Sequence, residues 1–131
     1  LIPKRRTIYL SRNARLVQDI VAVVCLRPEN EISFDSLIDN LSGSLSYPID
    51  AGQVLQNLQH LRRGGLISVD WHQRVIKREG PMKEYVSKRV TTSEMWPMII
   101  DDWLRINRVV QDKHGAVNPE FQEFLSPRQQ R

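Results

Sequence analysis

Three carboxamide side chains and one histidine recur at helical spacing in the middle of the chain. Gln53, Gln56, Asn57 and His60 stand at offsets of 0, 3, 4 and 7 residues, so a helix places them on one side. A carboxamide both donates and accepts hydrogen bonds, as the major-groove edge of adenine requires. These four residues are therefore candidates for contacts to DNA bases. The alternative is an ordinary solvated helix face.

Basic side chains gather in two other stretches. Residues 1–15 hold five basic and no acidic residues, residues 16–61 hold one and six, and residues 62–90 hold eight and three. Lysine and arginine attract phosphates whatever the base sequence, so the basic stretches predict contacts to a DNA backbone. The candidates are Lys4, Arg5, Arg6, Arg63, Arg74, Lys77, Arg78, Lys83 and Lys88. The alternatives are a solubilising tail at residues 4–6 and protection of a sheet edge in the later stretch.

The composition excludes several kinds of chemistry. A chain of 131 residues, 40% hydrophobic and 26% charged, fits one domain or one small domain with an appended helix. Its longest apolar run, Ile20–Leu26, is too short to span a bilayer. The single cysteine excludes an internal disulfide and a cysteine-based zinc site, and it favours a cytoplasmic location. The three histidines lack metal-ligand spacing and no catalytic motif is present, so we expect no metal, no cofactor and no enzyme activity.

Apolar periodicity and capping residues predict the helices that would hold these groups. Three helices are expected over residues 15–26, 34–45 and 50–63. Ser33 caps the second helix, and Asp50 caps the third. The first helix is apolar around nearly its whole circumference, so we expect it to be buried on more than one side.

A basic hairpin is predicted after the third helix. Leu66–Lys77 alternates apolar and polar residues, as a half-buried strand does. Met82–Val90 is expected to return as a second strand after a turn at residues 79–81. The hairpin would then cover residues 66–90, and a separate extended segment is expected at residues 31–33.

A last helix, beginning between Ser93 and Pro97 and ending at Gly115, carries a large apolar stripe. The stripe consists of Trp96, Ile99, Ile100, Trp103, Ile106 and Val110. Because so large an apolar surface does not stay in water, we expect one edge to cover the first helix and the other to form a homodimer. The alternative is packing within a monomer. The consecutive residues Asp101 and Asp102 point apart and are expected in solvent.

The order of these elements resembles the winged helix-turn-helix superfamily, in particular transcription regulators of the MarR and PadR type. The likeness is carried by ISFDSLIDNL, IDAGQVLQNLQHLRRGGLISV and REGPMKEYVS, and it covers about residues 15–90. It implies an α+β, mainly helical fold with a three-helix core, a basic β-hairpin and an appended C-terminal amphipathic helix. The corresponding units are a basic arm (1–12), a winged-helix domain (13–92), a dimerisation helix (93–115) and a tail with a possible short helix (116–131).

The resemblance implies a sequence-specific, double-stranded DNA-binding protein, acting as a dimeric transcriptional regulator. Helix 50–63 would enter the major groove, and hairpin 66–90 would form the wing. Two features favour an alternative, a winged helix used for protein–protein docking within a larger assembly. The stretch from Asp19 to Asp50 is acidic, and the third helix holds no Arg or Lys before Arg62.

Overall fold

The computed structural model describes residues 12–45 and 47–126, and Lys4, Arg5 and Arg6 of the predicted arm lie outside them. The architecture is α+β and mainly helical, with one small antiparallel sheet, which confirms the expected fold class at that level. In chain order the elements are α2 (Arg12–Leu26), β1 (Glu31–Ser33), α3 (Phe34–Ser44), α4 (Ala51–Arg63), β2 (Ile67–Asp70), β3 (Val75–Arg78), α5 (Pro81–Tyr85), the π-helix η1 (Val86–Val90), α6 (Trp96–His114), α7 (Pro119–Gln122) and the 3-10 helix η2 (Glu123–Leu125).

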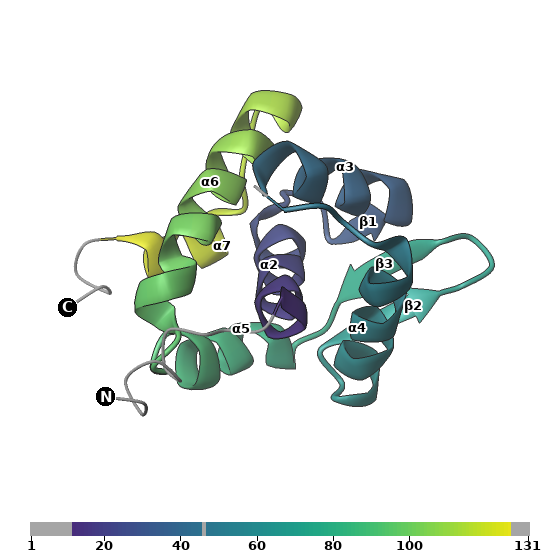
Figure 1. The fold of residues 1–131 in the computed structure, drawn as a ribbon, viewed down its shortest axis with the longest axis horizontal. Helices are drawn as coiled ribbons and strands as arrows, with labels where there is room; N and C mark the ends of the chain where they lie inside the picture. The colour runs from purple at the N-terminus through teal and green to yellow at the C-terminus, as the bar shows by residue number, and fades with distance from the viewer. Residues whose placement is uncertain (1–11, 46, 127–131) are drawn as a thin grey trace.

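Helix α2 lies in the middle of the molecule, with α6 on one side and α4 on the other (Figure 1). Every residue from Ile20 to Leu26 is fully buried, because α3, α4, α6 and α7 all pack against this helix. Its nearly continuous apolar circumference requires such cover. The prediction of burial on more than one side is confirmed.

The second and third predicted helices begin and end within a residue or so of the expected positions because their caps act as the sequence suggests. The Ser33 hydroxyl accepts a hydrogen bond from the Ser36 N–H, at 3.0 Å, and begins α3. The Asp50 carboxylate accepts from the Gly52 N–H, at 2.8 Å, and begins α4. Helix α4 ends at Gly64 and Gly65, the latter with a φ of 77° that suits glycine.

The sheet has the strand order β1-β3-β2, with antiparallel pairing throughout. Ile32 pairs with Ile76, which pairs with Val69, so these three residues share the face turned toward the core. Lys77 stands opposite Glu31 and Ser68 on the other, exposed face. The hairpin therefore consists of residues 67–78, with its turn at residues 71–74.

The second predicted strand is wrong, because residues 82–90 are helical. The buried residues there are Met82, Val86 and Val90, which recur every four positions, as one face of a helix requires. Pro81 occupies the first turn, where its missing N–H costs little. The expected turn at residues 79–81 is thus a helix start, and the hairpin is much shorter than predicted.

The apolar stripe of α6 does not form the predicted dimer interface. All six of its residues are buried within the chain, with Trp103 fully inaccessible. Trp96 and Trp103 pack edge to face with ring centroids 5.6 Å apart, and the stripe covers α2 and α3. The homodimer prediction at these residues is therefore wrong, because one chain already covers both edges of the stripe. One continuous core includes α6, without a division at residue 92.

Candidate nucleic-acid interface

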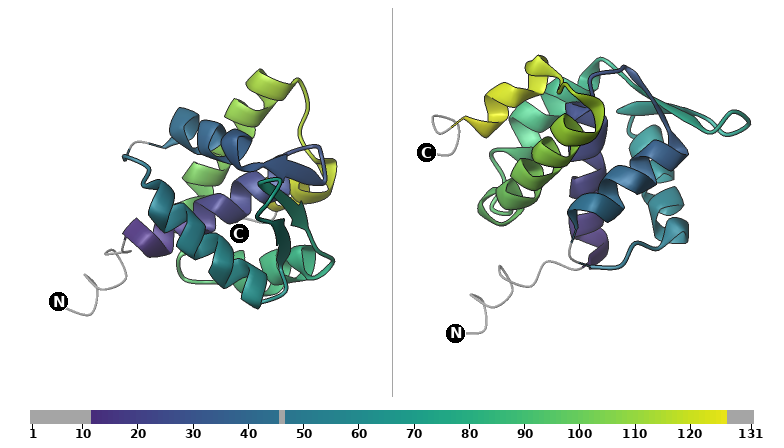
Figure 2. Two further views of the ribbon diagram at one scale, coloured as in Figure 1. Left: turned by 90° about the vertical axis from the view of Figure 1, so that its right-hand side faces the viewer. Right: turned by 90° about the horizontal axis from the view of Figure 1, so that it is seen from above.

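The exposed side of α4 is the first candidate surface, and Figure 2 (left) looks onto this helix. The structure places Gln53, Gln56 and His60 there, together with Arg63. No acidic residue lies between positions 51 and 63 to compete with a phosphate. The surface therefore combines neutral hydrogen-bonding groups with a positive charge at the C-terminal end of the helix.

Asn57 does not belong to this surface. It is 6% exposed, and its side-chain N–H donates to the side-chain oxygen of Asn13, at 3.2 Å. The position stands three residues after Val54 and four before Leu61, which both face the core. The prediction of a base contact from Asn57 is corrected for that reason.

Gln59 was missed by the sequence analysis, although it follows Gln56 by three residues. It is half-buried, and its side-chain oxygen accepts two hydrogen bonds from the Arg62 guanidinium, at 3.1 and 3.0 Å. Gln59 thereby holds Arg62 along the outside of the helix. From here on, the α4 surface means Gln53, Gln56, Gln59, His60 and Arg63.

The hairpin beside α4 holds two of the predicted backbone contacts. Arg74 and Lys77 are both exposed, and the Arg74 guanidinium lies 5.1 Å from the ring centroid of Phe34. Asp70 holds the turn, because its carboxylate accepts hydrogen bonds from the backbone N–H groups of His72 and Gln73, at 3.0 and 2.9 Å. The two cations are thus presented by a hydrogen-bonded turn and a paired strand.

Arg78 is half-buried and forms hydrogen bonds within the fold, so it does not belong to the candidate interface. Its guanidinium donates to the main-chain carbonyls of Val24 and Arg27, at 2.7 and 2.8 Å. It therefore satisfies carbonyls at the C-terminal end of α2, which have no partner within their own helix. Arg78 follows the inward-facing Ile76 by two residues, and strand alternation turns both to the same face.

Lys83 and Lys88 lie on α5 and η1 and are not brought together with the hairpin. The Lys83 ammonium is 3.8 Å from the Glu123 carboxylate, on the side of the C-terminal turns. Lys88 forms an ion pair with Glu84 at 2.9 Å.

Lys88 also lines a hollow of about 860 Å³ between α2, the end of α4 and α5–η1. His60, Arg63 and Arg89 line the same hollow, and so does Glu84, the ion-pair partner of Lys88. We call the four basic residues of this lining the basic edge. It extends the positive charge of α4 on the side away from the hairpin. Arg89 belongs to the basic stretch that was predicted to form the wing, and the structure places it on η1 instead.

A smaller hollow of about 260 Å³ lies on the hairpin side of α4. It is lined by Phe34, Leu55, Val69, Trp71, Arg74 and Ile76, and we call it the apolar hollow. Leu55 and Trp71 are 40% and 43% exposed. Among the described residues, Met98 on α6 is the one other large hydrophobic side chain so exposed. Apolar groups therefore gather next to the α4 surface.

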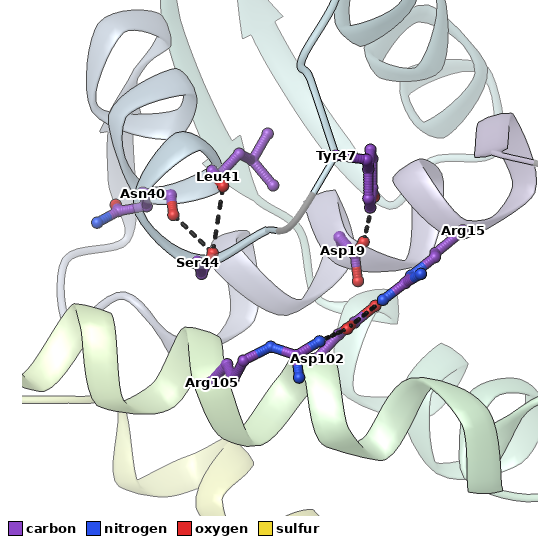
Figure 3. A network of polar contacts seen from close by, with 8 residues as sticks. All are labelled: Arg15, Asp19, Asn40, Leu41, Ser44, Tyr47, Asp102 and Arg105. Carbon is purple, nitrogen blue, oxygen red and sulfur yellow. Dashed lines mark hydrogen bonds and ion pairs between the residues drawn. The ribbon is translucent and has the colours of Figure 1, made fainter.

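A buried polar network fixes the segment that leads into α4 (Figure 3). Arg15 forms a two-pronged ion pair with Asp102, at 2.7 and 2.8 Å, and Arg105 contacts the same carboxylate. The Tyr47 hydroxyl donates to Asp19 at 2.5 Å, and the Arg15 guanidinium lies over the Tyr47 ring. Asp102 is fully buried, so the expectation that it is solvated is wrong. The network joins α2, α6 and the loop before α4.

The two carboxyl groups of this network have opposite pKa shifts. Burial raises the pKa of Asp19 to about 8, despite the Tyr47 hydrogen bond. Burial opposes ionisation of Asp102 too, but the hydrogen bonds from Arg15 and the positive charges of Arg15 and Arg105 outweigh it and hold the pKa of Asp102 below its ordinary value. Within this pair, the surroundings therefore oppose ionisation of Asp19 and favour ionisation of Asp102.

We predict that Asp19→Asn changes how stability depends on pH. In the unfolded chain Asp19 ionises near pH 4, whereas in the folded chain it ionises near pH 8, so unfolding releases a proton between these values. The wild-type free energy of unfolding should therefore fall, relative to the variant, as pH rises through this window, and level off above it. Urea unfolding at pH 5, 7 and 9 measures the difference. If the free energies of unfolding of the wild type and Asp19→Asn changed with pH in parallel, Asp19 would be ionised in the folded chain.

Comparison with protein-family models, with curated protein sequences and with solved structures finds no match to this chain. No helix in the described part of the chain is long and apolar enough to cross a membrane. Within residues 12–45 and 47–126, no three His, Cys, Asp or Glu side chains gather as metal ligands would. The α4 surface and its neighbours are therefore the basis for assigning a function.

Proposed function

We propose that the chain is a sequence-specific, double-stranded DNA-binding protein of the winged-helix type. Helix α4 would lie in the major groove, with the β2–β3 hairpin as the wing. The observation that carries the proposal is the α4 surface, which has exposed carboxamides, no carboxylate and cations on both flanks. The element order helix, strand, helix, helix and hairpin, on which the resemblance to winged helices rests, supports it.

The proposed contacts divide into two kinds. Gln53 and Gln56 would hydrogen-bond to base edges, where a carboxamide matches adenine. Arg74 and Lys77 on the hairpin, and the basic edge on the opposite flank, would contact phosphates and fix the orientation of the helix. Such a protein would act as a transcriptional regulator in the cytoplasm. It would either occlude its DNA site or recruit other factors to that site.

We predict that Arg63→Ala and Lys77→Ala each weaken binding to all duplexes alike. Each variant loses one phosphate contact, so the slope of log affinity against log salt should become shallower by about one unit. Fluorescence anisotropy titrations at several salt concentrations measure this slope. Lys83→Ala, which removes an equal charge beside Glu123, is the matched control and should leave the slope unchanged. Equal changes in all three variants would mean that net charge, rather than this surface, attracts the DNA.

A protein-docking module is the second candidate function, and the apolar hollow is the observation that favours it. Exposed Leu55 and Trp71 could anchor an apolar side chain of a partner. A selection of random duplexes across a salt series distinguishes the two functions. Binding confined to very low salt, with no preferred sequence, would favour docking over sequence-specific DNA recognition.

A further inference from the structure

Two exposed apolar side chains lie beside a surface proposed to bind DNA. Leu55 on α4 and Trp71 on the hairpin line the same hollow, and no carboxylate lines it. Arg74 lines this hollow as well, so a bound group there would meet both apolar and cationic side chains. Large apolar groups gathered on a surface commonly mark a binding site.

The position of Leu55 relates the hollow to the carboxamides of α4. Gln56 directly follows Leu55 and is exposed, whereas the side-chain oxygen of Gln59, one turn further on, is occupied by Arg62, so Gln56 is the hydrogen-bonding group beside Leu55. An A·T base pair presents the same combination in the major groove, because adenine offers a donor and an acceptor while thymine offers its 5-methyl group. The chemistry of this flank of α4 therefore matches A·T pairs.

We propose that Leu55 and Trp71 contact thymine methyl groups, so that the chain selects duplexes with consecutive A·T pairs under α4. This inference rests on the proposed DNA-binding function and names the sequence class that it would recognise. Arg74 in the lining supports DNA over an apolar protein segment as the occupant, because a cation beside the hollow would meet a phosphate of the duplex. A hollow of about 260 Å³ accommodates a methyl group.

Uracil tests the inference, because it differs from thymine by the absence of the 5-methyl group alone. Duplexes selected from a random library by the full chain are prepared once with thymine and once with uracil. We expect A·T-rich selected sequences and a loss of affinity of about fourfold per contacted methyl group on replacement by uracil. Leu55→Ala should bring the two affinities closer together. Met98→Ala, which removes an equally exposed side chain from α6, should keep the wild-type ratio.

The possible results distinguish the proposed methyl contacts from DNA binding itself. Sequence-selective binding with equal affinity for thymine and uracil would overturn the methyl contacts and leave DNA binding in place. A thymine preference that Leu55→Ala leaves unchanged would overturn them as well, since it would come from DNA shape. Failure to bind any duplex would overturn the proposed function and this inference together, and would favour a protein partner at the hollow.

Trp71 provides a second, spectroscopic test. The other tryptophans, Trp96 and Trp103, are 4% and 0% exposed, so acrylamide should quench the fluorescence of Trp71 selectively. We expect a selected duplex to protect this fluorescence from quenching, and Trp71→Phe to abolish the protected signal. Unchanged quenching in a saturated complex would show that Trp71 lies away from the DNA and would overturn its assigned contact.

Discussion

Trp103→Ala should lower the free energy of unfolding by about 3–5 kcal/mol, the cost of removing a large aromatic side chain from a packed core. Trp103 is fully buried and packs edge to face against Trp96. Its indole N–H finds no acceptor among the described residues, so the loss comes from packing alone. Urea unfolding followed by circular dichroism measures the change.

Two further variants of α6 make this result interpretable. Met98→Ala removes an exposed side chain from the same helix and should change stability by less than about 0.5 kcal/mol. Trp103→Phe retains most of the ring volume and should remain folded if the alanine variant does not. A stable Trp103→Ala protein that sediments as a smaller species than the wild type would instead restore a dimer interface at α6.

Asp102→Asn should lower the free energy of unfolding by about 2–3 kcal/mol. The substitution keeps the shape of the side chain but removes the charge that pairs with Arg15 and Arg105. Breaking a fully buried ion pair costs about 3–5 kcal/mol, and we expect less here because the two arginine side chains are 34% and 40% exposed. Denaturant unfolding at pH 7 measures the loss.

The pH dependence of this loss and a neighbouring variant provide the controls. The pKa of Asp102 is lowered in the folded chain, so its stabilising effect is present at neutral pH and disappears as pH falls through that pKa. The wild type and Asp102→Asn should therefore converge in acid. Asp101→Asn makes the same chemical change at an exposed position and should have almost no effect. Equal losses in both variants would mean that the net charge of α6, rather than the buried ion pair with the arginines, determines the stability.

Helical periodicity made most of the fold predictable from the sequence. The caps Ser33 and Asp50 and the glycines after α4 set the helix ends that were expected. Helix and strand patterns are ambiguous over short, polar stretches, however, and residues 82–90, which follow a turn signal at residues 79–81 and hold Tyr85 and Val86, also fit a returning strand. Spacing of Met82 and Val86 by four residues was the available signal for a helix.

The candidate site was less predictable, because its errors depend on contacts between distant parts of the chain. Asn57 lies just beyond the exposed face of α4, and the side chain of Asn13 is its polar partner. Burial of Asp102 depends on Arg15, which is 87 residues away in sequence. The sequence does not show how much of α2 the other elements leave uncovered. It therefore could not show that the six residues of the α6 stripe are covered within one chain. A residue pattern shows which face of a helix or strand is buried, but it does not show which element packs against that face.

The central position of α2 has a consequence for biosynthesis. Ile20–Leu26 must be surrounded by later elements, yet α6 is complete only after the 88 residues from Arg27 to His114 have been added. At about 5–20 residues per second, a ribosome leaves this apolar helix without its main cover for about 4–18 s. A nascent chain interrupted before α6 would expose the same surface permanently. The segment Ile20–Leu26 is therefore where a chaperone would be expected to bind the growing chain.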